Sequence, residues 1–237
     1  MKSLAAFGLA ALLPSLSSAH YLFPDLIVNG EISTGYVHVR EHDNGFEPSM
    51  KEDIVNSDDF RCNKGSENHM DIEPAVVVAG QDEVGFQVSL GQGLFHPGPI
   101  TIYLSKAPGE VREYDGSGDW FKVYQLGTSD PWDGTDEGWL TWDQSQFTFL
   151  LPAEIPAGQY LMRIEQMAVH QPYAGKEFYF QCAHLDIQSD YTGPDPSPTI
   201  QFPGGYNGDP ALDFDSWVQP PPSYCPMPGP AQWPNGE

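Results

Sequence analysis

The first candidate for metal chemistry in this 237-residue chain is His20, because of what stands before it. Residues 1–19 have the pattern of a secretory signal peptide, with an early lysine, an apolar stretch too short to span a bilayer, and the small residues Ser17 and Ala19 at a cleavage point. Cleavage after Ala19 would make His20 the N-terminal residue. It would then carry an α-amino nitrogen and an imidazole together, although any residue type can follow a cleavage point by chance.

A second candidate ligand is His96, which lies in a proline-containing segment. The glycine-rich residues 91–93 come before it, Pro97 and Pro99 restrict the backbone after it, and a predicted strand starts at residue 100. A histidine in a rigid loop at the entrance of a strand is a good metal ligand. Taken alone, the same segment is also typical of a surface turn.

A carboxylate and a phenol share one face of a third segment. In a strand, side chains alternate between the two faces, so Phe178, Phe180 and Cys182 point one way, toward the predicted core. Glu177 and Tyr179 point the other way, outward, with their Cα atoms about 7 Å apart. The pattern also fits an ordinary half-buried strand without any function.

The other histidines carry no such signal. His38 and His42 would share a face of a strand but lie about 13 Å apart, too far to bind one ion. His69 and His184 belong to no recognisable motif. We expect all four on the surface.

Composition narrows the class of protein. The formal net charge is −23, with 10 Lys and Arg against 33 Asp and Glu, which makes nucleic acid and anionic membranes poor partners. After the signal region, which is itself too short, no later stretch is long and apolar enough to span a bilayer. With 24 Gly and 23 Pro, the chain predicts many turns and few long helices. We expect a secreted, extracellular monomer whose acidic composition suits a neutral substrate or an acidic medium.

The three cysteines, Cys62, Cys182 and Cys225, allow three single pairings. Export favours one disulfide. Cys182 lies in a strong strand pattern, so we expect it to be a structural partner and predict a Cys62–Cys182 bond. Cys225 would remain as a free or intermolecular thiol.

The elements that must position these residues are short strands. Period-two alternation and flanking turn residues predict an all-β fold: an antiparallel β-sandwich close to the immunoglobulin or fibronectin-III type, with long loops. The predicted strands are Leu26–Asn29, Tyr36–Arg40, Ala75–Ala79, Val84–Leu90, Ile100–Ser105, Phe121–Leu126, Gln146–Leu151, Tyr160–Val169 and Glu177–Ile187. In Tyr36–Arg40, Val37 and Val39 are expected to share one face.

Two long connections, residues 41–73 and 188–237, fall outside this pattern. The second is rich in Pro and Gly but also in aromatic residues, which disordered tails usually lack. We expect it to wrap along the sandwich. No Ser/Thr-rich linker is present, so residues 20–237 are expected to form one catalytic domain without an appended carbohydrate-binding module.

An ordered set of motifs extends this reading. With His20 after the signal, the chain resembles a fungal lytic polysaccharide monooxygenase of auxiliary activity family 9, formerly glycoside hydrolase family 61. The motifs are Val28-Asn-Gly30, Asp59-Phe-Arg-Cys62-Asn63, His96-Pro-Gly-Pro99, Ile102-Tyr-Leu-Ser-Lys-Ala-Pro108, Leu161-Met-Arg163-Ile-Glu165, Ala168-Val-His170, Glu177-Phe-Tyr179, Phe202-Pro-Gly-Gly-Tyr206 and Pro228-Gly-Pro-Ala-Gln-Trp233.

The resemblance implies a β-sandwich and one copper ion, Cu(II) or Cu(I), held in a histidine brace. His20 would supply its α-amino nitrogen and a ring nitrogen, and His96 a third nitrogen. Tyr179 would lie near the axial position. The α-amino pKa of about 7.7–8.0 makes loss of its proton to a metal easy near neutrality, and nitrogen ligands in a flat arrangement suit copper.

Three further roles follow from the resemblance. His170 matches a histidine that donates a hydrogen bond toward the oxygen species. Tyr206 matches an aromatic residue of the flat substrate surface, on which a sugar ring can stack. Tyr21 is expected to join that surface.

One position departs from the family. Where the family normally has glutamine, two residues before the tyrosine, this chain has Glu177. A carboxylate there should stabilise Cu(II) over Cu(I), lower the reduction potential and, when protonated, serve as an acid. Our hypothesis is slower or pH-shifted turnover compared with a Glu177→Gln variant.

The function implied is oxidative cleavage of cellulose or a related β-1,4-glucan at C1 and/or C4, with an external electron donor and O2 or H2O2. One alternative is a non-catalytic copper or polysaccharide binder of the same fold, which Glu177 supports. A two-carboxylate glycoside hydrolase is the other. It would leave His20 and His96 unexplained, and no carboxylate pair has an evident spacing for it.

Overall fold

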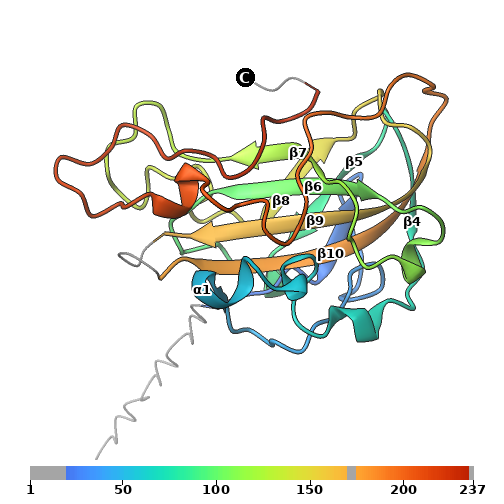
Figure 1. The fold of residues 1–237 in the computed structure, drawn as a ribbon, viewed down its shortest axis with the longest axis horizontal. Coiled ribbons are helices and arrows are strands. Elements are labelled where there is room, and N and C mark those ends of the chain that lie inside the picture. Colours follow the sequence, from blue (N-terminus) through green and yellow to red (C-terminus); the bar gives the residue numbers. More distant parts are fainter. Residues whose placement is uncertain (1–19, 170–174, 235–237) are drawn as a thin grey trace, which may run out of the picture.

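A computed structural model of the chain describes residues 20–169 and 175–234 (Figure 1). Two sheets face each other. The four-stranded sheet has the order β2-β1-β5-β8, and the six-stranded sheet has the order β3-β10-β9-β6-β7, with β4 also paired to β10. The strands are β1 Asp25–Val28, β2 Glu31–Ile32, β3 Ser49–Met50, β4 Ala75–Val78, β5 Glu83–Gln87, β6 Ile100–Lys106, β7 Phe121–Leu126, β8 Gln146–Leu150, β9 Gly158–Ala168 and β10 Glu177–Gln188.

This arrangement confirms the predicted all-β sandwich. The pairings are antiparallel except that of β4, which runs parallel to the last residues of β10. β3 pairs with the first residues of β10, so both short strands lie along the same edge of that long strand. The predicted strands are present with ends shifted by a few residues, with one exception.

The exception is Tyr36–Arg40, which is not a strand. Its only ladder contact is a single bridge between Val39 and Ala183, and Tyr36 has a φ of 64°. Val37 is 48% exposed while Val39 is fully buried, so the two valines do not share an environment. Arg40 is also buried, because its guanidinium donates hydrogen bonds to the carbonyls of Val111 and Tyr114.

The six-stranded sheet is buried on both faces. Its inner face packs against the four-stranded sheet through one apolar cluster, which includes Leu26, Phe86 and Ile164. Its outer face packs under loop segments through a second cluster, which includes Phe60 and Phe202. A strand whose alternate residues enter two different cores has no face open to solvent.

The two long connections cover the outer face, as the C-terminal segment shows in red in Figure 1. They carry most of the helical turns: α1 Lys51–Ile54, η1 Asp58–Phe60, η2 Ser66–His69 and η5 Pro210–Asp213, while η3 Ser89–Gly91 and η4 Val111–Glu113 lie between strands. Phe202, Tyr206 and Phe214 are buried, which confirms the predicted wrap. Trp217 and Tyr224 remain 63% exposed.

The predicted Cys62–Cys182 disulfide is present and spans 120 residues. It ties the first long connection to the middle of β10. Cys225 is a free, buried thiol, and burial raises its pKa to about 12. Within the described residues, none of the helices has the length and apolar character needed to cross a membrane.

Two of the histidines expected on the surface are buried. His184 is fully buried on β10 and accepts a hydrogen bond from Arg40 Nε at 2.7 Å. His42 is 8% exposed, and its Nδ1 accepts the backbone N–H of Asn44. Burial lowers the pKa of His184 to about 3 and that of His42 to about 4. The surface prediction was wrong for both, because neither lies on a strand with a solvated face.

Candidate copper site

The two candidate histidines and Tyr179 meet at one end of the sandwich, where β9 ends and β10 begins (left in Figure 1). His20 comes five residues before β1, and His96 four residues before β6. The sheet register pairs Tyr179 with Gln166 and Gln166 with Ile100. One rung across β10, β9 and β6 therefore forms the floor of the site.

The three rings form a compact group. Ring centroids are 6.3 Å apart for His20 and His96, 6.2 Å for His20 and Tyr179, and 5.7 Å for His96 and Tyr179. Both histidines are half-buried, whereas Tyr179 is only 3% exposed. Two half-buried imidazoles thus lie beside a buried phenol.

The loop that carries His96 is fixed by backbone bonds to the end of β9. Val169 donates its N–H to the carbonyl of Pro97 at 2.8 Å, and Met167 donates to the carbonyl of Pro99 at 3.1 Å. Gly98 allows this approach, since a Cβ there would collide with the carbonyl of Met167. The His-Pro-Gly-Pro segment therefore continues β6 along β9 and holds His96 at the sheet end.

The strand pattern predicted that Tyr179 faces outward, but in the structure it does not. It belongs to the cluster between the sheets, while Phe178 and Phe180 face the outer cluster. Its hydroxyl donates to Glu177 Oε2 at 3.0 Å. Burial first, and the nearby Glu177 charge second, raise the pKa of the Tyr179 phenol well above its ordinary value. The phenol is therefore neutral and its proton is directed to the carboxylate.

A second carboxylate reaches the site from the first long connection. Glu47 Oε1 lies 3.6 Å from His20 Nδ1, and its side chain is 72% exposed. Solvent screening makes such a contact weak. The sequence around Glu47 carries no signal for this position, because the contact depends on how the loop returns to the sheet end.

Tyr21 was expected on a substrate surface, but it is buried, with 2% exposure. Its ring stacks on Tyr179 with centroids 4.3 Å apart and planes 29° apart. Its hydroxyl donates to Gln166 Oε1 at 2.5 Å. Burial, followed by the charges of Tyr179 and Glu177, raises the pKa of Tyr21 well above its ordinary value. Tyr21 is therefore part of the floor of the site and cannot stack on a sugar.

Gln166 was not predicted to matter. It is fully buried, accepts from Tyr21 and donates from Nε2 to the carbonyl of His96 at 3.1 Å. A signal did exist in the sequence, since Gln166 is the polar residue among the alternate positions that include Tyr160, Met162 and Ile164. A buried amide needs hydrogen-bond partners, so a glutamine in such a strand indicates a polar contact inside the core.

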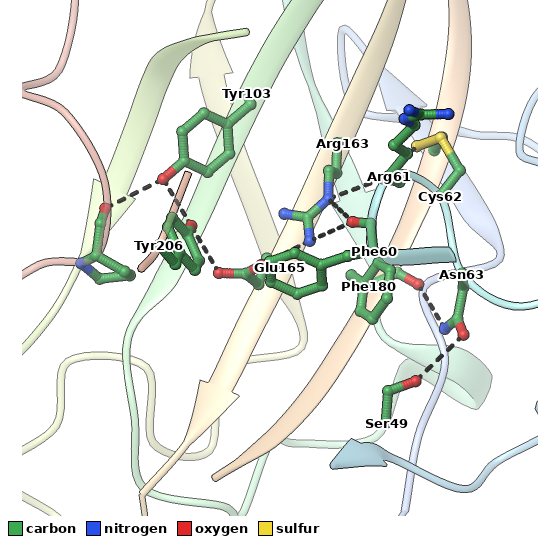
Figure 2. A network of polar contacts seen from close by, with 12 residues as sticks. Ser49, Phe60, Arg61, Cys62, Asn63, Tyr103, Arg163, Glu165, Phe180 and Tyr206 are labelled. Atoms are coloured by element: carbon green, nitrogen blue, oxygen red, sulfur yellow. Dashed lines mark hydrogen bonds and ion pairs between the residues drawn. A yellow bond between two sulfur atoms is a disulfide. The ribbon is translucent and has the colours of Figure 1, made fainter. Parts of the chain in front are cut away.

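Tyr206, the other expected substrate residue, is also buried (Figure 2). Its hydroxyl donates to Glu165 Oε1 at 2.9 Å and lies 2.8 Å from the hydroxyl of Tyr103. Glu165 in turn forms a buried ion pair with Arg163 at 2.6 Å. Tyr206 thus belongs to a polar network under the C-terminal segment. The expectation of a sugar-stacking role is corrected by this burial. His170 lies outside the described residues.

The donor set fits copper in a histidine brace. Within the described residues, no group of three or more His, Cys, Asp or Glu side chains could hold a metal ion. A metal at this end would instead draw on the imidazoles of His20 and His96 and on the α-amino nitrogen that removal of residues 1–19 would expose. Nitrogen ligands with a neutral phenol beside them suit copper better than they suit calcium or magnesium, which prefer oxygen ligands.

The sequence of this two-histidine sandwich also matches a known family. A sequence model described as Auxiliary Activity family 9 (formerly GH61) matches residues 20–224. The chain therefore belongs to auxiliary activity family 9, the lytic polysaccharide monooxygenases, which cleave polysaccharides oxidatively.

Individual relatives agree. The chain is 42% identical to AA9 family lytic polysaccharide monooxygenase G of Aspergillus tamarii, over 99% of this chain and 72% of that protein. It is 36% identical to AA9 family lytic polysaccharide monooxygenase C of Emericella nidulans, over 98% and 99% of the two chains. The crystal structure of a cellulose-active polysaccharide monooxygenase from M. thermophila has the same fold, with a TM-score of 0.75 and 23% identity over 90% of this chain and 99% of that one.

Proposed function

We propose that this protein is a secreted, copper-dependent monooxygenase that cleaves cellulose or a related β-1,4-glucan at C1 and/or C4. The observation that carries the proposal is the convergence of His20, His96 and Tyr179, with ring centroids 5.7–6.3 Å apart at the surface end of the sandwich. Family membership supports polysaccharide as the substrate class.

In this proposal, His20 and His96 hold one copper ion through two ring nitrogens and the His20 α-amino nitrogen. Bound copper supplies one-electron exchange with an external donor and activation of O2 or H2O2 toward a C–H bond. Tyr179 closes the site from below with a neutral hydroxyl. Glu177 accepts the proton of that hydroxyl in a hydrogen bond and places negative charge beside the site.

Exposed aromatic residues around the two histidines provide a surface for sugar rings. Phe46 precedes Glu47 and is 47% exposed, and Phe95 precedes His96 and is 46% exposed. Trp217, 63% exposed, follows Ser216, whose hydroxyl donates to the Val169 carbonyl beside the His96 loop. Aromatic faces exposed to water suit the apolar faces of pyranose rings. These three replace Tyr21 and Tyr206 as the proposed substrate contacts.

The net charge of the chain supports a neutral substrate, and residues 1–19 support secretion. A chain with a net charge of −23 favours a neutral glucan over a polyanionic polysaccharide. Residues 1–19, which lie outside the described residues, have the pattern of a secretory signal, and their removal would create the His20 amine. One relative in structure is named as cellulose-active. Residues 20–237 would act as a single catalytic domain.

The test uses the protein cut before His20 and loaded with one equivalent of copper. It is incubated with cellulose, and separately with soluble cello-oligosaccharides, in the presence of ascorbate and low peroxide. Mass spectrometry should reveal aldonic acids for C1 attack or 4-keto sugars for C4 attack, and both should vanish without copper or reductant. Simple reducing ends as the only new products would contradict the proposal.

A second function is favoured by one observation. Because the Tyr179 hydroxyl is directed to a carboxylate, copper could be held while oxygen chemistry is suppressed. The protein would then be a non-catalytic copper or polysaccharide binder. Tight copper binding with no oxidised product on either substrate would favour this alternative.

A further inference from the structure

Tyr21 touches each part of the chain that carries a proposed copper ligand. It follows His20 directly, its ring stacks on Tyr179 at 4.3 Å, and its centroid lies 5.7 Å from that of His96. Its edge also meets Phe23 at 5.8 Å in the inter-sheet core. A side chain with these contacts can set the positions of all three ligands relative to one another.

Gln166 completes the connection. Its amide carbonyl accepts from the Tyr21 hydroxyl, and its amide N–H donates to the carbonyl of His96. One fully buried side chain on β9 thus joins the residue after His20 to the residue that carries the other imidazole. The amide is suited to this, because it offers an acceptor and a donor at its two ends.

We propose that Tyr21 and Gln166 are positioning residues for the copper brace, which set the distance between the N-terminal His20 and the His96 loop. This inference rests on the proposed function. The two residues act through His20, His96 and Tyr179, and neither is proposed to touch the metal or the substrate.

The need for such a device follows from the chain end. Terminal residues fray unless something ties them down, and a brace requires the amine and ring of the first residue to stay in place. After Tyr21, Leu22 exchanges hydrogen bonds with Ser89, and Phe23 donates to Gln181. Those bonds fix Leu22 and Phe23, which follow the residues of the site. The bond of Tyr21 with Gln166, in contrast, connects the chain end through one side chain to the backbone of His96.

The experiment measures copper binding in the protein cut before His20, with copper alone as the probe. The variants are Tyr21→Phe, which removes one hydroxyl but keeps the stacked ring, and Gln166→Met, which removes both amide bonds at similar volume. Tyr160→Phe is the matched control: Tyr160 is also fully buried, and its hydroxyl donates one hydrogen bond, to the carbonyl of Pro156, near the opposite end of β9. Readouts are the Cu(II) dissociation constant by calorimetry, the Cu(II) EPR spectrum, and urea unfolding of the copper-free proteins.

Both variants should weaken Cu(II) binding about tenfold or more, as is typical when groups that orient metal ligands are lost. Both should also change the copper hyperfine splitting, which a loss of general stability would not do. Tyr160→Phe should leave the dissociation constant and the spectrum unchanged while it lowers stability by a similar amount.

Unchanged copper affinity and EPR spectrum in Tyr21→Phe would overturn the inference, even if Gln166→Met failed to fold, because that variant loses a single oxygen atom. The unmodified protein separates this from failure of the proposed function. If the unmodified protein bound no copper at all, the proposed function would be contradicted. If it bound copper and Tyr21→Phe gave the same affinity and spectrum, only the positioning role would be contradicted.

Discussion

The hydroxyl of Tyr179 donates to Glu177 Oε2 at 3.0 Å, although both residues lie in one strand and are separated by Phe178. Same-face neighbours two apart on a strand are about 7 Å apart at Cα, and a long carboxylate can bridge that gap. The bond directs the phenol proton to the carboxylate. It also keeps negative charge at the site, where the resemblance to the family had implied a neutral amide.

Replacing Glu177 with glutamine should therefore raise the Cu(II)/Cu(I) midpoint potential and speed turnover. At an effective dielectric near 20, removing a unit charge a few ångströms from the metal is worth on the order of 1–4 kcal/mol, or roughly 40–170 mV for one electron. Redox titration of the copper-loaded proteins measures the shift. Glu47→Gln is the control, and its exposed charge should give a smaller change. Equal potentials for Glu177→Gln and the unmodified protein would contradict the prediction.

Loss of the Cys62–Cys182 disulfide should cost about 2–4 kcal/mol of unfolding free energy, because the bond closes a long loop in the unfolded chain. Urea unfolding of a Cys62→Ala, Cys182→Ala variant measures this. Cys225→Ala, at a buried free thiol, should cost only about 1 kcal/mol, as does the loss of one buried methyl group. An equal loss in the two proteins would show that the crosslink itself contributes nothing.

Stability should fall as the pH drops below neutrality because of two buried histidines. In the folded protein the pKa is about 4 for His42 and about 3 for His184, against about 6.5 in the unfolded chain. Below pH 6.5 the two histidines bind protons in the unfolded state but stay neutral in the folded state until the pH approaches their lowered pKa values. Stability that is fully present above pH 6.5 is therefore lost toward these lower values, by about 2 kcal/mol per histidine between pH 7 and pH 5.

The test is urea unfolding at pH 7 and pH 5 of the unmodified protein and of His42→Gln, whose amide oxygen can still accept the Asn44 N–H. The variant should lose about 2 kcal/mol less over this interval. His38→Gln, at a half-buried histidine, controls for the substitution itself. Identical losses in His42→Gln and the unmodified protein would mean that His42 takes up its proton inside the fold.

Trp217→Ala should weaken binding to cellulose about fivefold, since an aromatic contact is worth roughly 1 kcal/mol. Binding isotherms with copper-loaded protein in the absence of reductant measure this without catalysis. Tyr191→Ala is the matched aromatic control. Tyr191 comes just after the end of β10, and the twelve residues of that strand separate it from the site. If the two variants bind cellulose equally, Trp217 lies outside the substrate contact.

The sequence predicted the sandwich from short segments of period-two alternation between turn residues, although a sheet buried on both faces does not require such alternation. Residues 177–182 illustrate both the strength and the limit of that signal. The pattern correctly separated Tyr179 from Phe178 and Phe180. It could not tell that both faces are covered, because the outer cover comes from residues 200–214, which are distant in sequence.

The candidate ligands were visible because each has a local signal: His20 follows a leader, and His96 stands beside prolines. Tyr21 and Tyr206 were misplaced because an aromatic residue in a loop motif looks the same whether it faces a sugar or a core. Glu47 was missed because it reaches the site only through a returning loop. Gln166 was missed although it is a polar residue among apolar positions of one strand face, and the register of β9 with its neighbours places it at the site.

The double burial of the six-stranded sheet has a consequence for hydrogen exchange. β9 is paired along both edges, to β10 and to β6, and Tyr160–Ala168 are all buried. Amides with no exposed face and no open edge exchange with solvent only when the whole molecule unfolds. Deuterium should therefore enter β9 among the last segments, together with β6, which is also buried and paired along both edges. The strand that carries Gln166 should thus open only with the whole fold, and the candidate site is built against it.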